Sequence, residues 1–425
     1  MPRIEAIVLS VLLSSHFLVG FAQNDEYGRI AALRKRSAQP KTMTIGPVVP
    51  EWQNVNLEQN RLITYIGCIF INAHLTESET VPRGYFTGDE RTKSATCVVF
   101  ENSTMDRLPK ELVPAFPNAV NLVLEHLQIR TIERGAFDKG EKLEELNLDH
   151  NNITHLELGV FSALRELRVL SLDHNQISRL APGLFAFNAK LAQVYLNGNR
   201  LTKIEDNTFS NISEMVYLSN NNLERLDFSQ FSKVTILDVS LNRLTEVKVQ
   251  NGVNKRLQEL SLRGNRLTNI SWLARFRALK EVDLAHNEIQ QVLPEYFPAE
   301  MPLKNLLMNN NRLIRFDIPP AHLRQLRWVE LSYNLLTAID LSSPLLDKLE
   351  FLYLRNNNIK TLKVSPNNTL FTVSLSNNDW DCANLRQQLA VIPSESLRAS
   401  DEPPCKAGYI MERGYCCKES NMLPH

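Results

Sequence analysis

Two Asp-His-Asn triplets are the positions of this 425-residue sequence whose residue types and spacing suggest metal chemistry. His150 and His174 lie 24 residues apart, and Asp149 and Asp173 precede them. Imidazole nitrogens and carboxylate oxygens placed together are ligands for divalent metal ions. The alternative, which we favour, is that these side chains are solvated, so we assign no metal-binding residues.

Signatures of catalysis are missing from the sequence. It contains no GxSxG nucleophile motif, no HExxH zinc motif, no phosphate-binding loop and no glycine-rich dinucleotide turn. Its 15 glycines are scattered along the chain. We therefore predict a binding protein that has no catalytic residues and uses no cofactor.

The interval between the two histidines is one copy of a period that runs through most of the chain. The unit LxxLxLxxNxL recurs, and a degenerate first copy carries Leu127 where the asparagine belongs. Strands with such alternating leucines stack, turn upon turn, into one parallel sheet. The pattern predicts an α/β solenoid, the leucine-rich-repeat horseshoe, with a parallel concave sheet and disulfide-bonded caps at both ends. Eleven asparagines mark the units, 21 to 24 residues apart: Asn151, Asn175, Asn199, Asn221, Asn242, Asn265, Asn287, Asn311, Asn334, Asn357 and Asn378.

The repeated asparagines and phenylalanines are predicted to be structural. Each asparagine leaves its strand and turns inward, where its amide can satisfy backbone groups that would cost about 1–3 kcal/mol each if buried unpaired. Phenylalanines near the end of the early units should stack as a second spine under the convex side: Phe137, Phe161, Phe185 and Phe209. Prolines occupy the later convex segments, which should be short and irregular: Pro294, Pro298, Pro302, Pro319 and Pro320.

The amino-terminal residues 1–22 are typical of a secretory signal peptide. Arg3 gives a basic start, the run from Ile7 to Phe21 is mostly apolar, and Ala22 is a suitable cleavage position. A membrane anchor is the alternative, but the apolar run is shorter than the roughly 20 residues that a span needs. Beyond it we expect a flexible tail at 23–55, an N-terminal cap at 56–118, about twelve repeats at 119–380 and a cysteine-containing cap at 381–425 with a short helix over 384–391.

Six cysteines fall into two groups, one near each end, with none in the 284 residues between them. In a secreted chain this grouping indicates disulfides that close the ends of the solenoid. We expect a bond between Cys68 and Cys97. At the other end we expect at least one bridge that begins at Cys382 and involves Cys405, Cys416 or Cys417. Five glycosylation sequons fit the same compartment: Asn102, Asn152, Asn211, Asn269 and Asn367.

Charge argues against nucleic acid or a membrane surface as the partner. Lys and Arg total 47, and Asp and Glu also total 47, so no overall field steers the molecule to polyanions. Outward positions of the sheet lie six, four and two residues before each asparagine, and nine of them are acidic against two arginines, Arg263 and Arg355. The nine are Glu125, Glu145, Asp149, Asp173, Asp238, Glu259, Glu281, Asp283 and Glu330.

We therefore hypothesise an acidic concave face that attracts a basic partner surface, with Asp238, Glu259, Glu281 and Asp283 as the central contacts. The alternative, which we favour slightly, is that these carboxylates only keep an exposed sheet soluble. Two aromatic clusters also lie in register on this face. Contact with a partner and packing across strands are equally compatible with them. The aromatic candidates are Tyr195 and Tyr217 in one cluster and Trp328, Phe351 and Tyr353 in the other.

Three segments resemble the mosquito leucine-rich-repeat immune proteins, the LRIM family, and most of all its Anopheles Plasmodium-responsive branch. They are Asn102–Pro109, Asn378–Cys382 and, most specifically, Gly414–Ser420 with its double cysteine. The resemblance runs from about Cys68 to Ser420 and implies a haemolymph protein that pairs with another leucine-rich-repeat immune protein and carries a complement-like thioester protein. Long and short family members continue past the double cysteine into a coiled coil, whereas this sequence ends eight residues after Cys417. Pairing through such a coil is therefore not carried over to this chain.

Two other classes of function compete with the immune role. An adhesive or matrix repeat protein would be expected to carry acidic Ser-Gly attachment sites, and the sequence has none. An inhibitor of the ribonuclease-inhibitor kind would be cytosolic and rich in cysteine. The sequence thus favours a secreted immune binding protein, with the matrix protein as the alternative.

Overall fold

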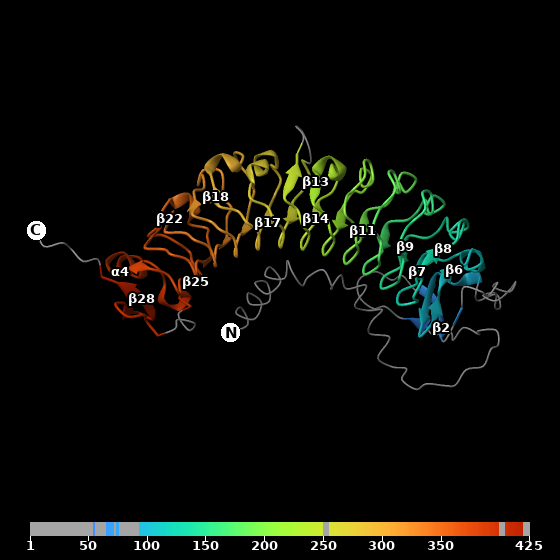
Figure 1. Cartoon of the computed structure of the whole chain (residues 1–425), viewed down its shortest axis with the longest axis horizontal. Helices are drawn as coiled ribbons and strands as arrows, with labels where there is room; N and C mark the ends of the chain where they lie inside the picture. Colours follow the sequence, from blue (N-terminus) through green and yellow to red (C-terminus); the bar gives the residue numbers. More distant parts are fainter. Residues whose placement is uncertain are drawn as a thin grey trace, which may run out of the picture.

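The chain forms a curved solenoid whose inner side is one continuous sheet (Figure 1). We analysed a computed structural model that describes residues 54–55, 65–71, 74–75, 93–249, 255–398 and 404–419. The predicted signal peptide and nearly all of the predicted tail lie outside these residues. Within them no helix is long and apolar enough to cross a membrane.

The concave sheet has 15 strands, and each strand lies beside the strand of the next turn. The first pair is antiparallel, β1 (Asn54–Val55) against β2 (Tyr65–Ile71), and all later pairs are parallel. The parallel strands after β2 are β4 (Cys97–Glu101), β7 (Asn121–Val123), β9 (Glu145–Asn147), β10 (Val169–Ser171), β11 (Gln193–Tyr195), β12 (Met215–Tyr217), β14 (Ile236–Asp238), β16 (Glu259–Ser261), β17 (Glu281–Asp283), β19 (Asn305–Leu307), β21 (Trp328–Glu330), β23 (Phe351–Tyr353) and β25 (Thr372–Ser374). This arrangement confirms the predicted solenoid.

The register of the strands explains the leucine pattern. The central residue of each strand pairs with the central residue of the next, as Leu146 does with Leu170 and Leu170 with Val194. These residues are fully buried. Because successive side chains of a strand point to opposite faces, the residues on either side of them face the concave surface. The repeat unit thus builds the core and the binding face together.

The convex side contains little helix. Short 3-10 turns occupy it at η4 (Val113–Ala115), η5 (Phe228–Phe231), η6 (Ser271–Arg275), η7 (Pro294–Tyr296), η8 (Pro344–Leu346) and η9 (Ser394–Ser396). Five small parallel pairs form two-stranded sheets separate from the concave sheet: β3 (His74–Leu75) with β5 (Thr104–Met105), β6 (Arg107–Leu108) with β8 (Thr131–Ile132), β13 (Arg225–Asp227) with β15 (Glu246–Lys248), β18 (Gln291–Val292) with β20 (Arg315–Phe316), and β22 (Ala338–Leu341) with β24 (Thr361–Val364). The irregular segments expected from the prolines are therefore present.

The predicted phenylalanine spine is confirmed and runs one turn further than expected. Phe137, Phe161, Phe185 and Phe209 are buried, with ring centroids 5.8–6.2 Å apart, and Phe231 continues the stack 5.5 Å from Phe209. Offset aromatic pairs at such distances stabilise a core by about 0.5–1.5 kcal/mol beyond burial alone. The spine holds the outer layer of the early turns.

The asparagine ladder binds each turn to the turn before it. Asn265 is typical: its Nδ2 donates to the carbonyl oxygens of Leu262 at 2.9 Å and of Val239, in the preceding turn, at 3.0 Å. Its Oδ1 accepts a hydrogen bond from the Leu244 N–H at 2.9 Å. The side chain is buried, so these bonds replace water at backbone groups that no strand satisfies. The predicted structural role of the asparagines is confirmed.

The residue before each ladder asparagine adopts a left-handed backbone conformation, a feature that the sequence analysis did not identify. In the eleven units with an asparagine, the φ of this residue lies between +52° and +66°. In the degenerate first unit the residue is His126, and its φ is +58°. Gly198 shows why two units use glycine here: a Cβ at this position would lie 2.7 Å from Nδ1 of His174. The side chains of this column therefore project at the edge of the concave face, a place occupied by His150, His174, His286 and Tyr333 among others.

The expected disulfide between Cys68 and Cys97 is wrong. Among the cysteines whose side chains the structure describes, Cys97 is the one outside a disulfide. The backbone register pairs Gly67 with Cys97 and Cys68 with Val98. The two cysteines are therefore one residue out of register with each other. Burial, followed by the charge of Glu145, raises the pKa of the Cys97 thiol to about 11 and keeps it protonated. Strand pairing, without a disulfide at Cys97, joins the described part of the N-terminal cap to the sheet.

The C-terminal cap contains two disulfides, Cys382–Cys417 and Cys405–Cys416. The first confirms the bridge expected at Cys382. The short helix expected over 384–391 is α4 (Cys382–Leu389), which begins two residues earlier. It packs beside a three-stranded sheet of β26 (Trp380–Asp381), β28 (Tyr415–Lys418) and β27 (Ile410–Glu412).

Replacing Asn265 by Ala should lower the free energy of unfolding by about 1–3 kcal/mol, because buried backbone groups of two turns lose their partner. Chemical denaturation of the purified protein measures this loss. Asn358→Ala, at an exposed side chain, is the control and should change stability by less than about 0.5 kcal/mol. Equal losses in the two variants would contradict the structural role of the ladder.

Removal of the Cys382–Cys417 bond should destabilise the protein more than removal of Cys405–Cys416. The bonds close chain segments of 35 and 11 residues, which correspond to about 4 and 3 kcal/mol of unfolded-state entropy. Two double Cys→Ser variants, compared by chemical denaturation, test the order. A larger loss of stability on removal of the Cys405–Cys416 bond would show that strain or residual structure, and not chain entropy, determines how much each disulfide stabilises the protein.

Candidate binding face

Backbone N–H groups donate hydrogen bonds to five of the nine acidic residues of the concave face: Asp149, Asp173, Asp238, Asp283 and Glu330. Asp149 Oδ1 accepts hydrogen bonds from the Asp173 N–H at 2.7 Å and from Ser171 Oγ at 2.5 Å. Asp173 Oδ1 accepts from the Asn197 N–H at 2.6 Å, one turn further on. Side chains thus link successive turns across the face, as the asparagine ladder does in the interior.

The later carboxylates hold the backbone of their own turn. Asp238, Asp283 and Glu330 each accept a hydrogen bond from the N–H two residues ahead, at 2.8–3.0 Å. Asp238 and Asp283 are only 7% and 1% exposed. These residues stabilise the bend after each strand, so two of the four predicted acidic contacts are closed to a partner. Glu259 and Glu281 are half-buried.

Burial raises the pKa values of seven of the nine carboxylates of this face. It raises the pKa of Asp149 to about 8, with the neighbouring Asp173 as the second cause, and the pKa values of Asp173 and Asp283 to about 6. It also raises the pKa values of Asp238, Glu259, Glu281 and Glu330. Asp149 is thus the carboxylate whose pKa lies above neutral pH, whereas a pKa of about 6 leaves Asp173 and Asp283 largely ionised at neutral pH. Recruitment of a basic partner by the acidic residues of this face stays a prediction.

Packing accounts for most of the predicted aromatic contacts. The rings of Tyr195 and Tyr217 stack 4.9 Å apart, and Tyr217 is buried. The ring centroids of Trp328 and Phe351 lie 5.2 Å apart, and both side chains are less than a tenth exposed. Tyr353, 5.8 Å from Trp328, is half-buried. Tyr195 and Tyr353 remain accessible to a partner, whereas the other three residues mainly hold the strands together.

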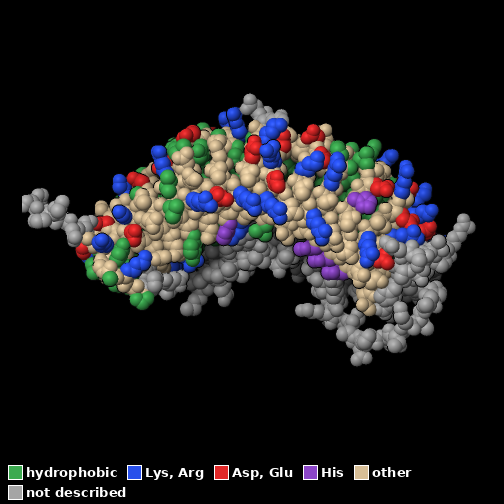
Figure 2. All heavy atoms as spheres, in the orientation of Figure 1, with side chains coloured by type: hydrophobic (Ala, Val, Ile, Leu, Met, Phe, Trp, Pro, Cys, Tyr) green, Lys and Arg blue, Asp and Glu red, His purple; other side chains and the backbone are tan. Residues whose placement is uncertain are grey.

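Three histidines, one from each of three successive turns, stack in a column. The imidazole centroids of His126 and His150 lie 4.3 Å apart, and those of His150 and His174 lie 4.4 Å apart with nearly parallel rings. Figure 2 shows histidine side chains gathered at the concave edge of the N-terminal half. In the described residues, no group of three or more His, Cys, Asp or Glu side chains is arranged to hold a metal ion.

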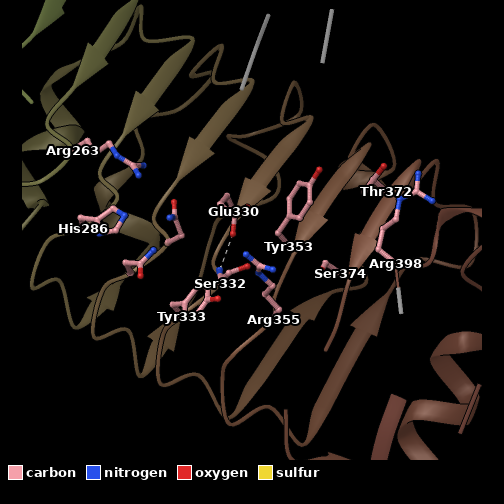
Figure 3. A pocket seen from close by; sticks show the side chains of 12 residues that line it. Arg263, His286, Glu330, Ser332, Tyr333, Tyr353, Arg355, Thr372, Ser374 and Arg398 are labelled. Carbon is pink, nitrogen blue, oxygen red and sulfur yellow. Dashed lines mark hydrogen bonds between the residues drawn. The ribbon is translucent and has the colours of Figure 1, made fainter. Parts of the chain in front are cut away.

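A hollow of about 570 Å³ opens on the C-terminal half of the concave face (Figure 3). Its lining includes Arg263 and Arg355 from the predicted face, together with Arg398. Glu330 lies between them on β21, and Tyr353 borders it. This hollow places cationic, aromatic and amide groups together, a combination common at protein interfaces.

Sequence analysis missed eight of the twelve lining residues of the hollow, among them His286, Tyr333 and Arg398. His286 and Tyr333 belong to the left-handed column one residue before an asparagine, and the repeat register could have identified them. Arg398 follows Leu397, which pairs with Val373 of β25 and so extends the sheet beyond the last repeat. No repeat signal marks Arg398, because it comes from the cap.

The five sequon asparagines lie on the part of the chain that the structure describes, and none is fully buried. Asn102, Asn269 and Asn367 are exposed, whereas Asn152 and Asn211 are half-buried. The Asn152 side chain accepts a hydrogen bond from Gln176 at 3.1 Å. Glycosylation of all five stays a prediction.

Comparison with known proteins identifies the repeat. The family profile described as "Leucine rich repeat" matches residues 117–177, 165–223 and 232–289. The crystal structure of the Anopheles APL1 leucine-rich repeat domain is 32% identical in sequence, with a TM-score of 0.69 over 83% of this chain and 98% of that domain. The LRIM1/APL1C complex is similar at 31% identity, with a TM-score of 0.70 over 88% of this chain and 72% of that one. The chain belongs to the leucine-rich-repeat immune-protein family that includes APL1 and LRIM1.

A further relative, a curated protein, matches a smaller part of this chain. Keratocan of Danio rerio is 30% identical over 145 residues, which is 32% of this chain. The match spans 40% of keratocan's own length. The similarity to APL1 and LRIM1/APL1C extends over most of this chain.

The stability of this family member should rise as pH falls from 8 to 5. The pKa of Asp149 is higher in the folded state, about 8, than the roughly 3.9 of an unfolded aspartate. The folded state therefore binds the proton more tightly throughout this window, and raising pH through it removes stability. Asp149→Asn should reduce the gain by on the order of 1–3 kcal/mol.

Denaturation midpoints at several pH values, for wild type and Asp149→Asn, measure this effect. Asp206→Asn, at an exposed position, is the matched control, and its denaturation midpoint should change with pH as that of the wild type does. The same pH dependence in Asp149→Asn as in the wild type would show that Asp149 is ionised in the folded protein.

Proposed function

We propose that this protein is a secreted innate-immune binding protein that pairs with another leucine-rich-repeat immune protein and carries or stabilises a complement-like thioester protein in haemolymph. The observation that carries the proposal is its similarity to the LRIM1/APL1C complex over 88% of the chain. That structure is a complex of LRIM1 with APL1C, and this chain is similar to it over most of its repeats. Recognition of a pathogen surface is a second form of the same role.

Several features of the chain support an extracellular role. The two C-terminal disulfides fit an oxidising compartment, and residues 1–22 have the composition of a signal peptide. The large concave surface and the absence of catalytic motifs from the sequence fit binding and not turnover. A matrix or adhesive protein is the alternative.

Affinity capture tests the role. The full chain, secreted with a C-terminal tag, is incubated with mosquito haemolymph, and the eluate is analysed by mass spectrometry. We expect a second leucine-rich-repeat immune protein and a thioester-containing protein, each enriched over an unrelated secreted repeat protein used as control bait. Size-exclusion chromatography with purified LRIM1 then tests direct pairing. Enrichment of matrix components alone, with no co-elution, would support the adhesive alternative and contradict the proposal.

A further inference from the structure

The flank of the solenoid that follows the concave strands carries the same four-residue unit three times. The sequence Asn-Arg-Leu-Thr begins at the ladder asparagines Asn199, Asn242 and Asn265. In each copy the leucine is buried, whereas the arginine before it and the threonine after it are exposed. Each unit thus presents a guanidinium group and a hydroxyl group, two residues apart, to solvent. The exposed pairs are Arg200 with Thr202, Arg243 with Thr245, and Arg266 with Thr268.

Backbone hydrogen bonds between turns place the three arginines in one column. The N–H of each arginine donates to a carbonyl oxygen of the preceding turn at 2.9 Å. Arg243 and Arg266 therefore lie on adjacent turns, with backbones roughly 5 Å apart. Arg200 lies two turns, roughly 10 Å, before Arg243, and Asn222 occupies the turn between them. Figure 2 shows the side of the solenoid that adjoins the histidine column, and Lys and Arg side chains gather over its middle turns.

The three arginines differ from other basic residues of this flank because they make no ion pair within the part of the chain that the structure describes. Like charges on adjacent turns repel each other, so the neighbouring guanidinium groups of Arg243 and Arg266 do not stabilise the fold. Their charges are available to an external anion. The basic residues nearby that are paired are Arg179 and Lys203, both with Glu205, Arg225 with Glu246, and Arg312 with Glu288.

Glu224 interrupts this surface and defines its centre. It lies two residues after Asn222, at the position that threonine occupies in the three units. Its side chain is exposed in the turn between Arg200 and Arg243. A carboxylate there opposes an anion that crosses this turn, whereas no acidic residue occupies the arginine and threonine positions of the Arg243 and Arg266 turns. The pair of arginines on adjacent turns is therefore the centre of the surface.

We propose that the three Asn-Arg-Leu-Thr units bind a linear sulfated polysaccharide, with Arg243 and Arg266 at the centre of the site and Arg200 as an outer contact. The planar guanidinium fork donates parallel hydrogen bonds to two oxygens of one anionic group, and neighbouring hydroxyl groups add further donors. A polymer with anionic groups at regular intervals matches cations that recur with the turns. Aromatic and arginine anchors in desolvated pockets are typical of protein interfaces, whereas these units are exposed and present no aromatic group. The inference goes beyond the proposed pairing with an immune protein and shares only its extracellular setting.

Fluorescence anisotropy with the purified full chain and a fluorescein-labelled heparin octasaccharide tests the surface. The chain is first treated with an N-glycosidase, because the predicted sequon at Asn269 directly follows Thr268. We expect saturable binding that weakens as salt rises, because salt screens exposed charges. Arg243→Gln and Arg266→Gln should each weaken binding about fivefold, and the double variant should weaken it at least about tenfold. Glu224→Gln should strengthen binding about twofold, because a repelling charge is removed.

Arg277→Gln is the matched control, because Arg277 is exposed but lies outside the three units, and it should bind as the wild type does. Chemical denaturation checks that each variant is folded. Full affinity in the folded double variant, or an equal loss in Arg277→Gln, would overturn the proposal. If an arginine variant folds poorly, Glu224→Gln still tests the site, and an unchanged affinity there would contradict it.

Three further ligands identify the class of polyanion. A desulfated heparin octasaccharide should bind at least about tenfold more weakly than the sulfated one, and equal binding would contradict the role of sulfate. Tighter binding of a glutamate-rich peptide would assign the surface to a protein partner, and tighter binding of phosphatidylserine vesicles would assign it to a membrane. Either result would overturn the proposal. Because no haemolymph partner takes part, failure here leaves the proposed pairing untouched, and failure of the pairing leaves this site untouched.

Discussion

The hydrogen bonds of the buried asparagine amides are the interaction on which the rest of this structure depends. A solenoid turn leaves its strand at a bend where no neighbouring strand satisfies the backbone. The amide of Asn265 joins the carbonyl oxygens of its own turn and of the preceding turn, and it accepts an N–H from that preceding turn. Because the eleven units that carry an asparagine repeat this connection, their strands stay in register along the sheet. The position of every residue on the concave face follows from that register.

Curvature then determines the chemistry of the concave face. The inner side of a curved sheet crowds its side chains, while the outer side has room for turns and for the phenylalanine spine. Crowding removes water from carboxylates such as Asp149 and Asp283, and backbone N–H groups replace that water. Desolvation outweighs these hydrogen bonds and raises the pKa values of both groups. Crowding also draws Trp328 and Phe351 together across neighbouring strands.

Repetition made most of the fold predictable from sequence, since each unit independently supports the same interpretation. The strands, the ladder, the spine and the cap helix all follow from residue spacing. The pairing of Cys68 with Cys97 failed because it depended on a register outside the regular repeat, where a shift of one residue reverses which side chains share a face. The ionisation of the acidic residues could not be predicted, because it depends on packing between turns and not on position within a turn.

The contribution of Arg398 shows why a site at the end of a solenoid is the hardest to predict. Within the repeats, an outward side chain is located by its distance from an asparagine, and Arg263 and Arg355 were located in this way. Arg398 reaches the face because Leu397 extends the sheet after β25, a contact between the cap and the last strand that has no repeated signal. The consequence is electrostatic as well as geometric. Three arginines gather at this end of the face, while backbone N–H groups of the turns hold five of the acidic side chains spread along it.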